Sequence, residues 1–231
     1  MKIRKVIKKA FSLVEIAVVL AVIGILLASV IIGKNLVDKA KIANAQALTV
    51  NSVVHSLDKN LVFWHETSFG QESYNNNIWL DYQQDKTKRS NTASSPPSPP
   101  TFLTTEQDSK LINNLPTIRF AANNSLSQPA LSNLTNSFFT IFVMHTGARD
   151  AGIFNGFNTE PSQTTIDGNK RLLVWRGINN ASLTHIGGTS GSISYVGDIY
   201  EIIVFNIQLT DELQNEVIAY LKAKYKFKTN N

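Results

Sequence analysis

The sequence predicts an α+β protein: a long N-terminal transmembrane helix, followed by an antiparallel β-sandwich that ends in a C-terminal helix. Three observations predict this arrangement. An apolar run near the N-terminus passes into a helical pattern that lasts to Leu57. Short stretches rich in β-branched and aromatic residues follow, separated by turn-forming residues. The helical period returns near the end of the chain, over residues 211–224.

Charge and cysteine content limit the classes of function. The chain has 231 residues, enough for one domain and an appendage, and no cysteine, which excludes disulfides and thiolate metal sites. The first ten residues hold five of the 22 basic residues and no acidic one, which leaves 17 basic against 17 acidic residues in the rest. The net charge of +5 therefore belongs to the N-terminal leader, and we expect no nucleic-acid partner.

Residues 13–32 form the apolar run, and Glu15 is their only charged residue. As a helix, such a run spans about 30 Å, the thickness of the hydrocarbon core of a bilayer. A cleaved secretory signal peptide has a shorter apolar region of about 7–15 residues, although Ala28 and Ser29 form a weak candidate cleavage site. A signal anchor fits better, with the basic leader in the cytoplasm and the rest exported.

Glu15 is unusual in such a helix. A carboxylate costs about 2.5–3.5 kcal/mol at the centre of a membrane helix and less near its end. The run contains no Lys, Arg or His to pair with it. A cut between Ala10 and Phe11 would create a partner, the new α-ammonium group of Phe11, in the same chain or in a neighbouring copy. We therefore interpret Glu15 as a functional residue.

The segment KKAFSLVEIAVVLAVIGIL, which starts at Lys8, resembles the class III signal of type IV pilins and type II secretion pseudopilins. The resemblance implies that prepilin peptidase recognises Lys8 and Lys9, cuts between Ala10 and Phe11, and methylates the new amine of Phe11. It also implies that Glu15 meets the N-terminus of a neighbouring subunit during assembly. The family usually has Gly before the cut, so Ala10 is a departure, and slower processing is compatible with it.

The helical pattern continues beyond the apolar run. One stripe of apolar residues follows steps of four and three: Leu36, Ala40, Ala43, Ala47, Val50, Val54 and Leu57. We favour packing of this stripe on the chain's own globular domain, and packing on neighbouring helices of a fibre is compatible with this interpretation. The predicted division is a cleaved leader at 1–10, a helix at 11–57 that spans the membrane at 13–32, and a β-sandwich at 58–231.

The remainder of the chain predicts strands and one helix. Seven stretches have strand character: 60–64, 77–82, 116–121, 137–145, 152–157, 171–177 and 198–206. The segment ASSPPSPP at 93–100 is expected to be an extended surface loop, because adjacent prolines favour polyproline II. Thr210 suits the N-cap of the closing helix, and Lys222 and Lys224 suit the negative end of its dipole.

A second resemblance covers roughly residues 57–227. The segments NNLPTIRF, FTIFVM and GDIYEIIVFNIQLTDELQNEVIAYLKAKYKF resemble the concanavalin A-like, laminin-G-type jelly roll, which commonly ends in a strand, a short turn and a closing helix. Members of that class bind carbohydrate or protein, and some are hydrolases. The fold alone does not choose among these activities.

The sequence predicts no enzyme. A retaining glycosidase holds two carboxyl groups about 5–5.5 Å apart, and two such groups on one strand require an even separation. Asp198 and Glu201 are three residues apart, which predicts that they point to opposite faces. Glu201 is expected at an edge or rim of the sheet, and no two of the four histidines have metal-ligand spacing.

Three weaker patterns bear on ligand binding. Asp81 and Asp85 form a candidate Ca²⁺ site with nearby carbonyls, although we predict no cofactor. Trp79 and Trp175 are candidate sugar-stacking platforms, and burial is the commoner fate of a strand tryptophan. The segment GGTSG, which starts at Gly187, is more typical of a hairpin turn than of a phosphate-binding loop.

The two resemblances predict a pilin-like structural subunit of a bacterial type IV pilus or related filament, whose exported head adheres to a surface glycan or protein. The alternative is a pseudopilin of a type II secretion system with a purely structural head, and a filament-tethered glycosidase is a distant third. The expected partners are prepilin peptidase, other pilin subunits and the inner membrane. The expected location is a single-pass inner-membrane protein that later enters a cell-surface or periplasmic filament.

Overall fold

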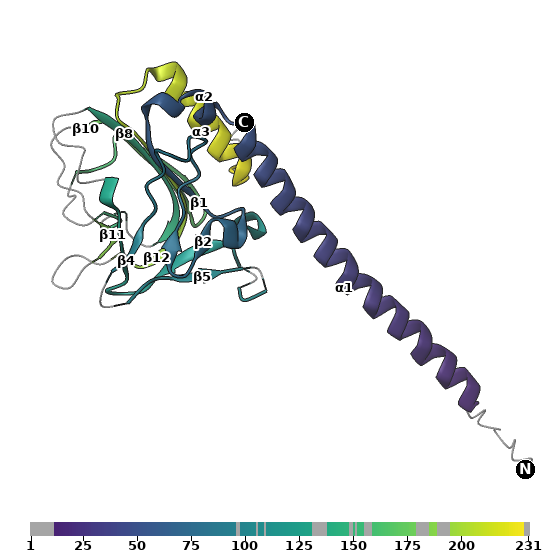
Figure 1. Cartoon of the computed structure of the whole chain (residues 1–231). Coiled ribbons are helices and arrows are strands. Elements are labelled where there is room, and N and C mark those ends of the chain that lie inside the picture. Colours follow the sequence, from purple (N-terminus) through teal and green to yellow (C-terminus); the bar gives the residue numbers. More distant parts are fainter. Residues whose placement is uncertain are drawn as a thin grey trace, which may run out of the picture. The chain divides into compact units, whose positions relative to one another are not determined.

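The computed structural model describes residues 12–95, 98–104, 106–108, 110–130, 138–147, 150, 152–154, 159–178, 185–188 and 195–228. The chain divides into two compact units, the first ending at Ala40 and the second comprising Lys41–Asn231. The α-helices are α1 (Leu13–Val50), α2 (Val53–Ser56) and α3 (Asp211–Lys224) (Figure 1). Short 3₁₀ helices occupy Asp58–Asn60, Gly70–Glu72 and Ile112–Asn114.

The first helix confirms the long apolar helix that the sequence predicts. By length and composition the segment Leu13–Ser56 could cross a membrane, since its most apolar 18-residue window has a mean hydropathy of 3.0. None of that window is buried inside the chain. A helix suits such a sequence because it satisfies every backbone hydrogen bond within the segment itself.

The second unit is built on one large antiparallel sheet, in the order β5-β6-β12-β8-β10-β9, with β1 also paired to β12. These strands are β1 (Leu61–Glu66), β5 (Thr101–Leu103), β6 (Thr117–Phe120), β8 (Phe139–Gly147), β9 (Gln163–Asp167), β10 (Lys170–Ile178) and β12 (Gly197–Phe205). β12 pairs with β8 along its length, while its other side pairs first with β6 and then with β1. β12 is therefore a central strand with both of its edges paired.

A smaller antiparallel sheet, β11-β7-β4, and a hairpin, β2-β3, complete the strands. Their bounds are β2 (Tyr74–Asn75), β3 (Ile78–Trp79), β4 (Ala93–Ser95), β7 (Ser125–Ser127) and β11 (His185–Gly187). Leu126 and Ile186 of the small sheet share one buried cluster with Ile141 and Val143 of β8. The two sheets thus enclose a hydrophobic core between them, as in a sandwich.

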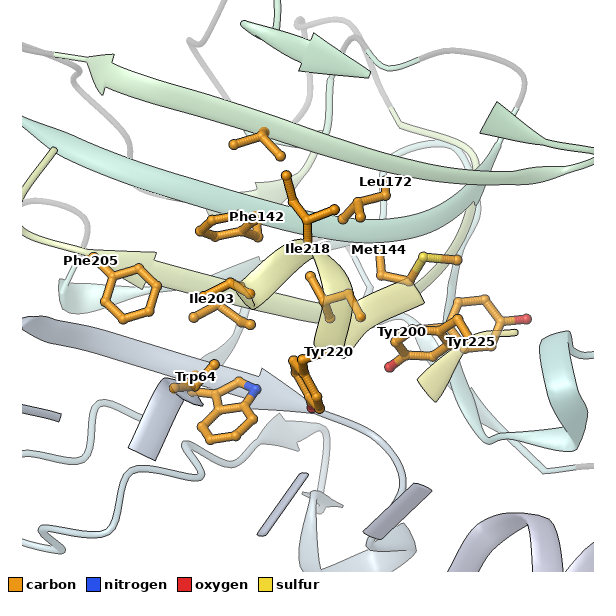
Figure 2. Close-up of a cluster of buried hydrophobic side chains, with 14 of the residues drawn as sticks. Trp64, Phe142, Met144, Leu172, Tyr200, Ile203, Phe205, Ile218, Tyr220 and Tyr225 are labelled. Atoms are coloured by element: carbon orange, nitrogen blue, oxygen red, sulfur yellow. The ribbon is translucent and has the colours of Figure 1, made fainter. Parts of the chain in front are cut away.

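The opposite face of the large sheet is covered by α3. Phe142 and Met144 of β8 alternate along the strand with Ile141 and Val143, so the two pairs point to opposite faces. Phe142 and Met144 pack into a second cluster with Ile218 of α3. Figure 2 shows side chains of α3 lying against this face of the strands. The large sheet is therefore buried on both faces, which explains why β8 and β12 read as nearly continuous apolar runs.

Several strand predictions are confirmed and three details differ. The segment 77–82 contributes only Ile78–Trp79, which pairs with Tyr74–Asn75 around two asparagines with positive φ. Within 152–157, the described residues form one isolated bridge, Phe154 to Ile186, and no strand. The extended-loop prediction for 93–100 is wrong at its start, because Ala93–Ser95 is a strand that pairs with β7.

The end of α1 belongs to the second unit, and its buried face differs from the predicted stripe. Ala45 and Thr49, which lie off the stripe, are buried, whereas Ala43 and Ala47 are exposed. Leu36, Ala40 and Val50 of the predicted stripe are also exposed. Beyond α1 the stripe packs on the head as predicted, because Val54 is buried and Leu57 packs against the same cluster. The predicted start of the β-sandwich at residue 58 stays a prediction, with the compact unit beginning at Lys41.

Candidate functional site

Glu15 lies in the first turn of α1 and is part of a capping box. The hydroxyl oxygen of Ser12 accepts a hydrogen bond from the Val14 amide at 3.2 Å, and Glu15 Oε2 accepts one from the Ser12 amide at 2.8 Å. This reciprocal arrangement satisfies two amides at the helix N-terminus that have no partner inside the helix. A carboxylate at this end also interacts favourably with the helix dipole. Glu15 therefore has a structural role within one chain.

Sequence reasoning identified Glu15 but missed the capping box. The spacing Ser12-x-x-Glu15 before an apolar run is the sequence signature of a capping box, so the box could have been predicted. The other predicted processing residues, Lys8, Lys9, Ala10 and Phe11, lie outside the residues that the structure describes.

The surroundings of Glu15 are apolar and exposed. Leu13 is 87% exposed, Val14 68% and Ile16 51%, and the large side chains up to Ile32 are also exposed. Such a surface is stable in a bilayer or in a bundle of helices. Glu15 is therefore placed where a lipid phase or other helices would surround it.

The head contains a buried cluster of charged side chains that the sequence did not reveal. Glu66 ends β1 and lies directly opposite Glu201 of β12 in the strand register. Lys224, in the last turn of α3, places its Nζ 2.8 Å from Glu201 Oε2 and 3.2 Å from Glu66 Oε2. Each of these three side chains is fully buried or nearly so, with at most 1% exposed.

Neutral donors surround both carboxylates. Trp64 Nε1 and the Tyr220 hydroxyl each donate to Glu201 Oε1 at 2.7 Å, and the Tyr225 hydroxyl donates to Oε2 at 2.8 Å. Glu66 accepts from the Ser68 amide at 2.8 Å and from the Ser73 hydroxyl at 2.7 Å. Burial, and after it the charge of Glu201, raises the pKa of Tyr220 and of Tyr225, so both phenols remain protonated donors. The cluster is internally satisfied, as buried charges require.

Two predictions about this region are wrong. Glu201 is buried in the sheet rather than at a rim. Lys224 lies in the last turn of α3, as predicted, and its side chain is buried between two carboxylates. The spacing argument for Asp198 and Glu201 fails because the register with β8 shifts between Ile199 and Glu201. That β-bulge places Tyr200 and Glu201 on the same side of the sheet, since an extra residue breaks the alternation.

The buried carboxylates are not accessible to a polysaccharide. Glu66 and Glu201 have neighbouring positions on adjacent strands, an arrangement that brings two carboxyl groups together. In this conformation, however, α3 and the aromatic side chains of Trp64, Tyr220 and Tyr225 enclose them. A sugar ring therefore has no route to either group.

Two histidines of the head, His65 and His145, are fully buried. Nδ1 of His65 lies 3.1 Å from the Leu80 carbonyl oxygen, and burial lowers the pKa of this histidine to about 4. Burial also lowers the pKa of His145, whose Nε2 lies 3.2 Å from Asp150 Oδ1. Across the described part of the chain, no three His, Cys, Asp or Glu side chains form a group able to hold a metal ion.

The candidate calcium pair does not form one site. Asp81 is buried and its Oδ1 accepts from the Trp64 amide at 2.9 Å, while its Oδ2 accepts from the Ser90 amide at 2.7 Å. Burial raises the pKa of Asp81 to about 6 despite these bonds. Asp85 is instead an exposed residue that accepts from the Thr87 hydroxyl at 2.6 Å. The oxygens of Asp81 are thus used within the protein.

The candidate sugar platforms are core residues. Trp79 is fully buried and Trp175 is 2% exposed, so neither offers a ring face to a ligand. Their indole nitrogens donate to the carbonyl oxygens of Glu66, at 2.9 Å, and Thr159, at 2.8 Å. The burial interpretation of both tryptophans is confirmed. In GGTSG, Gly187 ends β11, and residues 189–191 lie outside the described residues.

Comparison of the chain with protein-family models, curated proteins and solved structures finds no match. Three features of the chain bear on its function: the apolar helix with Glu15 in its first turn, the exposed stripe residues of α1, and the two-sheet head with its closing helix.

Proposed function

We infer that this chain is a filament subunit of the type IV pilin or type II secretion pseudopilin kind, held in a bacterial inner membrane by α1 before assembly. The observation that carries this proposal is Glu15, the one acidic residue of the apolar run at 13–32, in the first turn of an exposed helix. Capping alone does not require a charge at this position, because glutamine can also serve in a capping box, and a charge is costly in a membrane helix. A charged group is useful where apolar helices must assemble in one defined register.

Prepilin peptidase is the proposed processing enzyme, with its cut between Ala10 and Phe11. The cut leaves an α-ammonium group one residue before Ser12, whose amide already binds Glu15. The capping box fixes the Glu15 carboxylate near the helix terminus, where the ammonium group of an adjacent subunit would meet it. An ion pair in an apolar bundle is favourable only with good geometry. It would therefore favour one axial alignment of neighbouring subunit helices over others.

The exposed stripe of α1 supports contact between subunits. Ala40, Ala43 and Ala47 are small and exposed, and Leu36 and Val50 are 62% and 51% exposed. Small residues allow two helix backbones to approach closely. Exposure of the stripe residues within α1 thus supports packing on neighbouring helices of a fibre, while the end of the stripe, at Val54 and Leu57, packs on the head.

The head has two proposed roles. As an adhesive module it would bind a surface glycan or protein. As a structural head it would serve a secretion pseudopilin. Burial of Trp79 and Trp175 favours the structural role, since it removes the two sugar platforms that the sequence offered. A glycan array probed with residues 41–231 tests the glycan-binding form of the adhesive role, because specific binding supports it and the absence of binding contradicts it. We propose no enzymatic activity for either role.

The test of the proposal combines processing with assembly. N-terminal sequencing of the protein from cells that carry prepilin peptidase should begin at Phe11 with a methylated amine. A start at Met1, or after Ala28, contradicts the proposal. Glu15→Gln keeps an acceptor for the capping box but removes the charge. It should leave insertion and cleavage intact and reduce incorporation into filaments.

A matched control is Glu160→Ala, which removes an exposed carboxylate from the head and should incorporate like the wild type. Glu15→Ala should lower incorporation at least as much as Glu15→Gln, since it also removes the capping acceptor. Normal incorporation of Glu15→Gln would show that the carboxylate acts only as a helix cap.

A further inference from the structure

The charged cluster under α3 has the parts needed for covalent chemistry as well as for an ion pair. Glu66 and Lys224 are 0% exposed and Glu201 is 1% exposed. Taking such charges out of water is costly, and mutual attraction offsets the cost only in part. A reaction that removes a positive and a negative charge together would relieve that cost without exposing the cluster to water.

The atoms are arranged for attack of the Lys224 amine on the Glu201 carboxyl group. Nζ lies 2.8 Å from Glu201 Oε2 and is thus in contact with the carboxyl group. The other oxygen, Oε1, is held by two donors at 2.7 Å, Trp64 Nε1 and the Tyr220 hydroxyl. Two donors on one carboxyl oxygen form the kind of site that stabilises a tetrahedral oxyanion. Glu66 Oε2, at 3.2 Å from Nζ, is placed to carry a proton.

We propose that the folded head forms an amide bond between Nζ of Lys224 and Cδ of Glu201, with the loss of one water molecule. Lys224 would be the nucleophile and Glu201 the electrophile, while Glu66 would relay a proton. No cofactor, oxidant or second chain is required. The inference does not depend on the proposed role of the chain in a filament.

The reaction balances with the groups present. The Lys224 ammonium passes one proton to Glu201 Oε2, which gives a neutral amine beside a neutral acid. The amine attacks Cδ, a C–N bond forms, and negative charge develops on Oε1 between Trp64 and Tyr220. The nitrogen then passes a second proton to Glu66, and Glu66 returns it to Oε2. The C–O bond breaks, Oε2 leaves as water, and the carbonyl re-forms.

The product fits the same surroundings. The carbonyl oxygen of the new amide keeps Trp64 and Tyr220 as donors, and the amide N–H faces Glu66. Glu66 keeps the Ser68 amide and the Ser73 hydroxyl as donors, so its remaining charge stays satisfied. The bond would fasten α3 to β12 in a chain that has no cysteine for a disulfide. It would hold in place the helix that covers one face of the sheet.

Peptide mapping of the full chain, purified in detergent, denatured and digested with trypsin, tests the bond. An amide at Lys224 blocks cleavage there and joins residues 177–222, which contain Glu201, to residues 223–226. The linked species should be lighter than the sum of its two peptides by one water molecule. Recovery of free 177–222, together with cleavage after Lys224 into 223–224 and 225–226, would mean that the cluster is an ion pair only. Linkage of 223–226 to residues 60–86, which contain Glu66, would overturn the assignment of Glu201.

Three variants separate the roles of the residues. Lys222→Arg should retain the link, because Lys222 lies outside the cluster, whereas Lys224→Arg should lose it. Glu66→Gln keeps both reacting groups and should reduce the linked fraction at least tenfold, with the fold checked by circular dichroism. A fully linked Glu66→Gln protein would overturn the proton relay. The wild-type digest decides the proposal even if a variant fails to fold.

Discussion

The hydroxyl oxygens of Thr49 in α1 and Tyr220 in α3 lie 3.2 Å apart, although the residues are separated by 171 positions in the sequence. The Tyr220 hydroxyl also donates to Glu201 at 2.7 Å. Tyr220 thus links the end of the N-terminal helix to the buried charges of the head. This link lies within the second unit, so the last turns of α1 are part of the folded head.

The first prediction follows from this link. Tyr220→Phe removes a donor from the buried Glu201 carboxylate and a partner from Thr49, and should lower the free energy of unfolding by about 1–3 kcal/mol. Thr49→Val removes the contact with Tyr220, together with the hydrogen bond from the Thr49 hydroxyl to the Ala45 carbonyl at 3.0 Å, and should cost about 1 kcal/mol. Urea unfolding of both variants and of the double variant measures the coupling. Strictly additive effects would mean that the two hydroxyls do not interact.

The second prediction concerns the boundary of the head. Fragments 41–231 and 58–231 should both melt cooperatively, and 41–231 should melt at the higher temperature. The longer fragment keeps the buried Ala45 and Val54 and the hydrogen bond from Gln46 to the Ser68 carbonyl, at 3.0 Å. Thermal melting followed by far-ultraviolet circular dichroism measures both. Equal melting temperatures would support a boundary at residue 58.

The third prediction concerns α3. Truncation of the head at Leu209 should abolish the cooperative transition. Val217, Ile218 and Leu221 are buried against the sheet, and each large apolar side chain contributes about 1.5–3 kcal/mol when buried. Their sum approaches the whole stability of a typical domain, about 5–15 kcal/mol. Thermal melting of fragment 41–209 beside 41–231 checks this, and a retained transition at an unchanged temperature would contradict it.

The fourth prediction is a pH dependence from His65. Burial lowers the pKa of His65 to about 4 in the folded protein, against 6.5 for an unperturbed histidine, so the unfolded chain binds more protons between these pH values. Stability is therefore fully present above pH 6.5 and is lost as the pH falls toward 4, by about 3 kcal/mol. The difference in unfolding free energy between wild type and His65→Gln, measured at several pH values, isolates this contribution. A difference that does not change with pH would contradict the prediction.

The fifth prediction uses two glycines with positive φ. A Cβ on Gly187, at φ 83°, would lie 2.5 Å from the Asn124 carbonyl oxygen and 2.7 Å from the Phe120 ring. A Cβ on Gly168, at φ 63°, would meet no atom within 4 Å. Gly168→Ala should cost about 1–2 kcal/mol for backbone strain alone. Gly187→Ala should cost clearly more, because a backbone atom must also move, and similar costs in urea unfolding would contradict this.

The sequence by itself determined the elements and their order. The apolar run predicted α1, the β-branched stretches predicted most strands of the large sheet, and the cap at Thr210 predicted α3 over residues 211–224. These features are local, because a helical or strand period and a capping residue act over a few positions. Glu15 could be identified from the sequence for the same reason, because it is the only charged residue in the apolar run at 13–32.

Only the tertiary structure decided the rest. Glu66, Glu201 and Lys224 lie far apart in the sequence, and their contact requires β1 beside β12 and α3 across both. The bulge before Glu201 placed this side chain on a different face of the sheet from the one that strand alternation predicts. The buried face of α1 also differed from the apolar stripe in the sequence. Strand pairing over long separations and the choice of which helix face is covered are set by packing of the whole domain. A pattern that extends over a few residues therefore predicts neither the strand pairing nor the buried helix face.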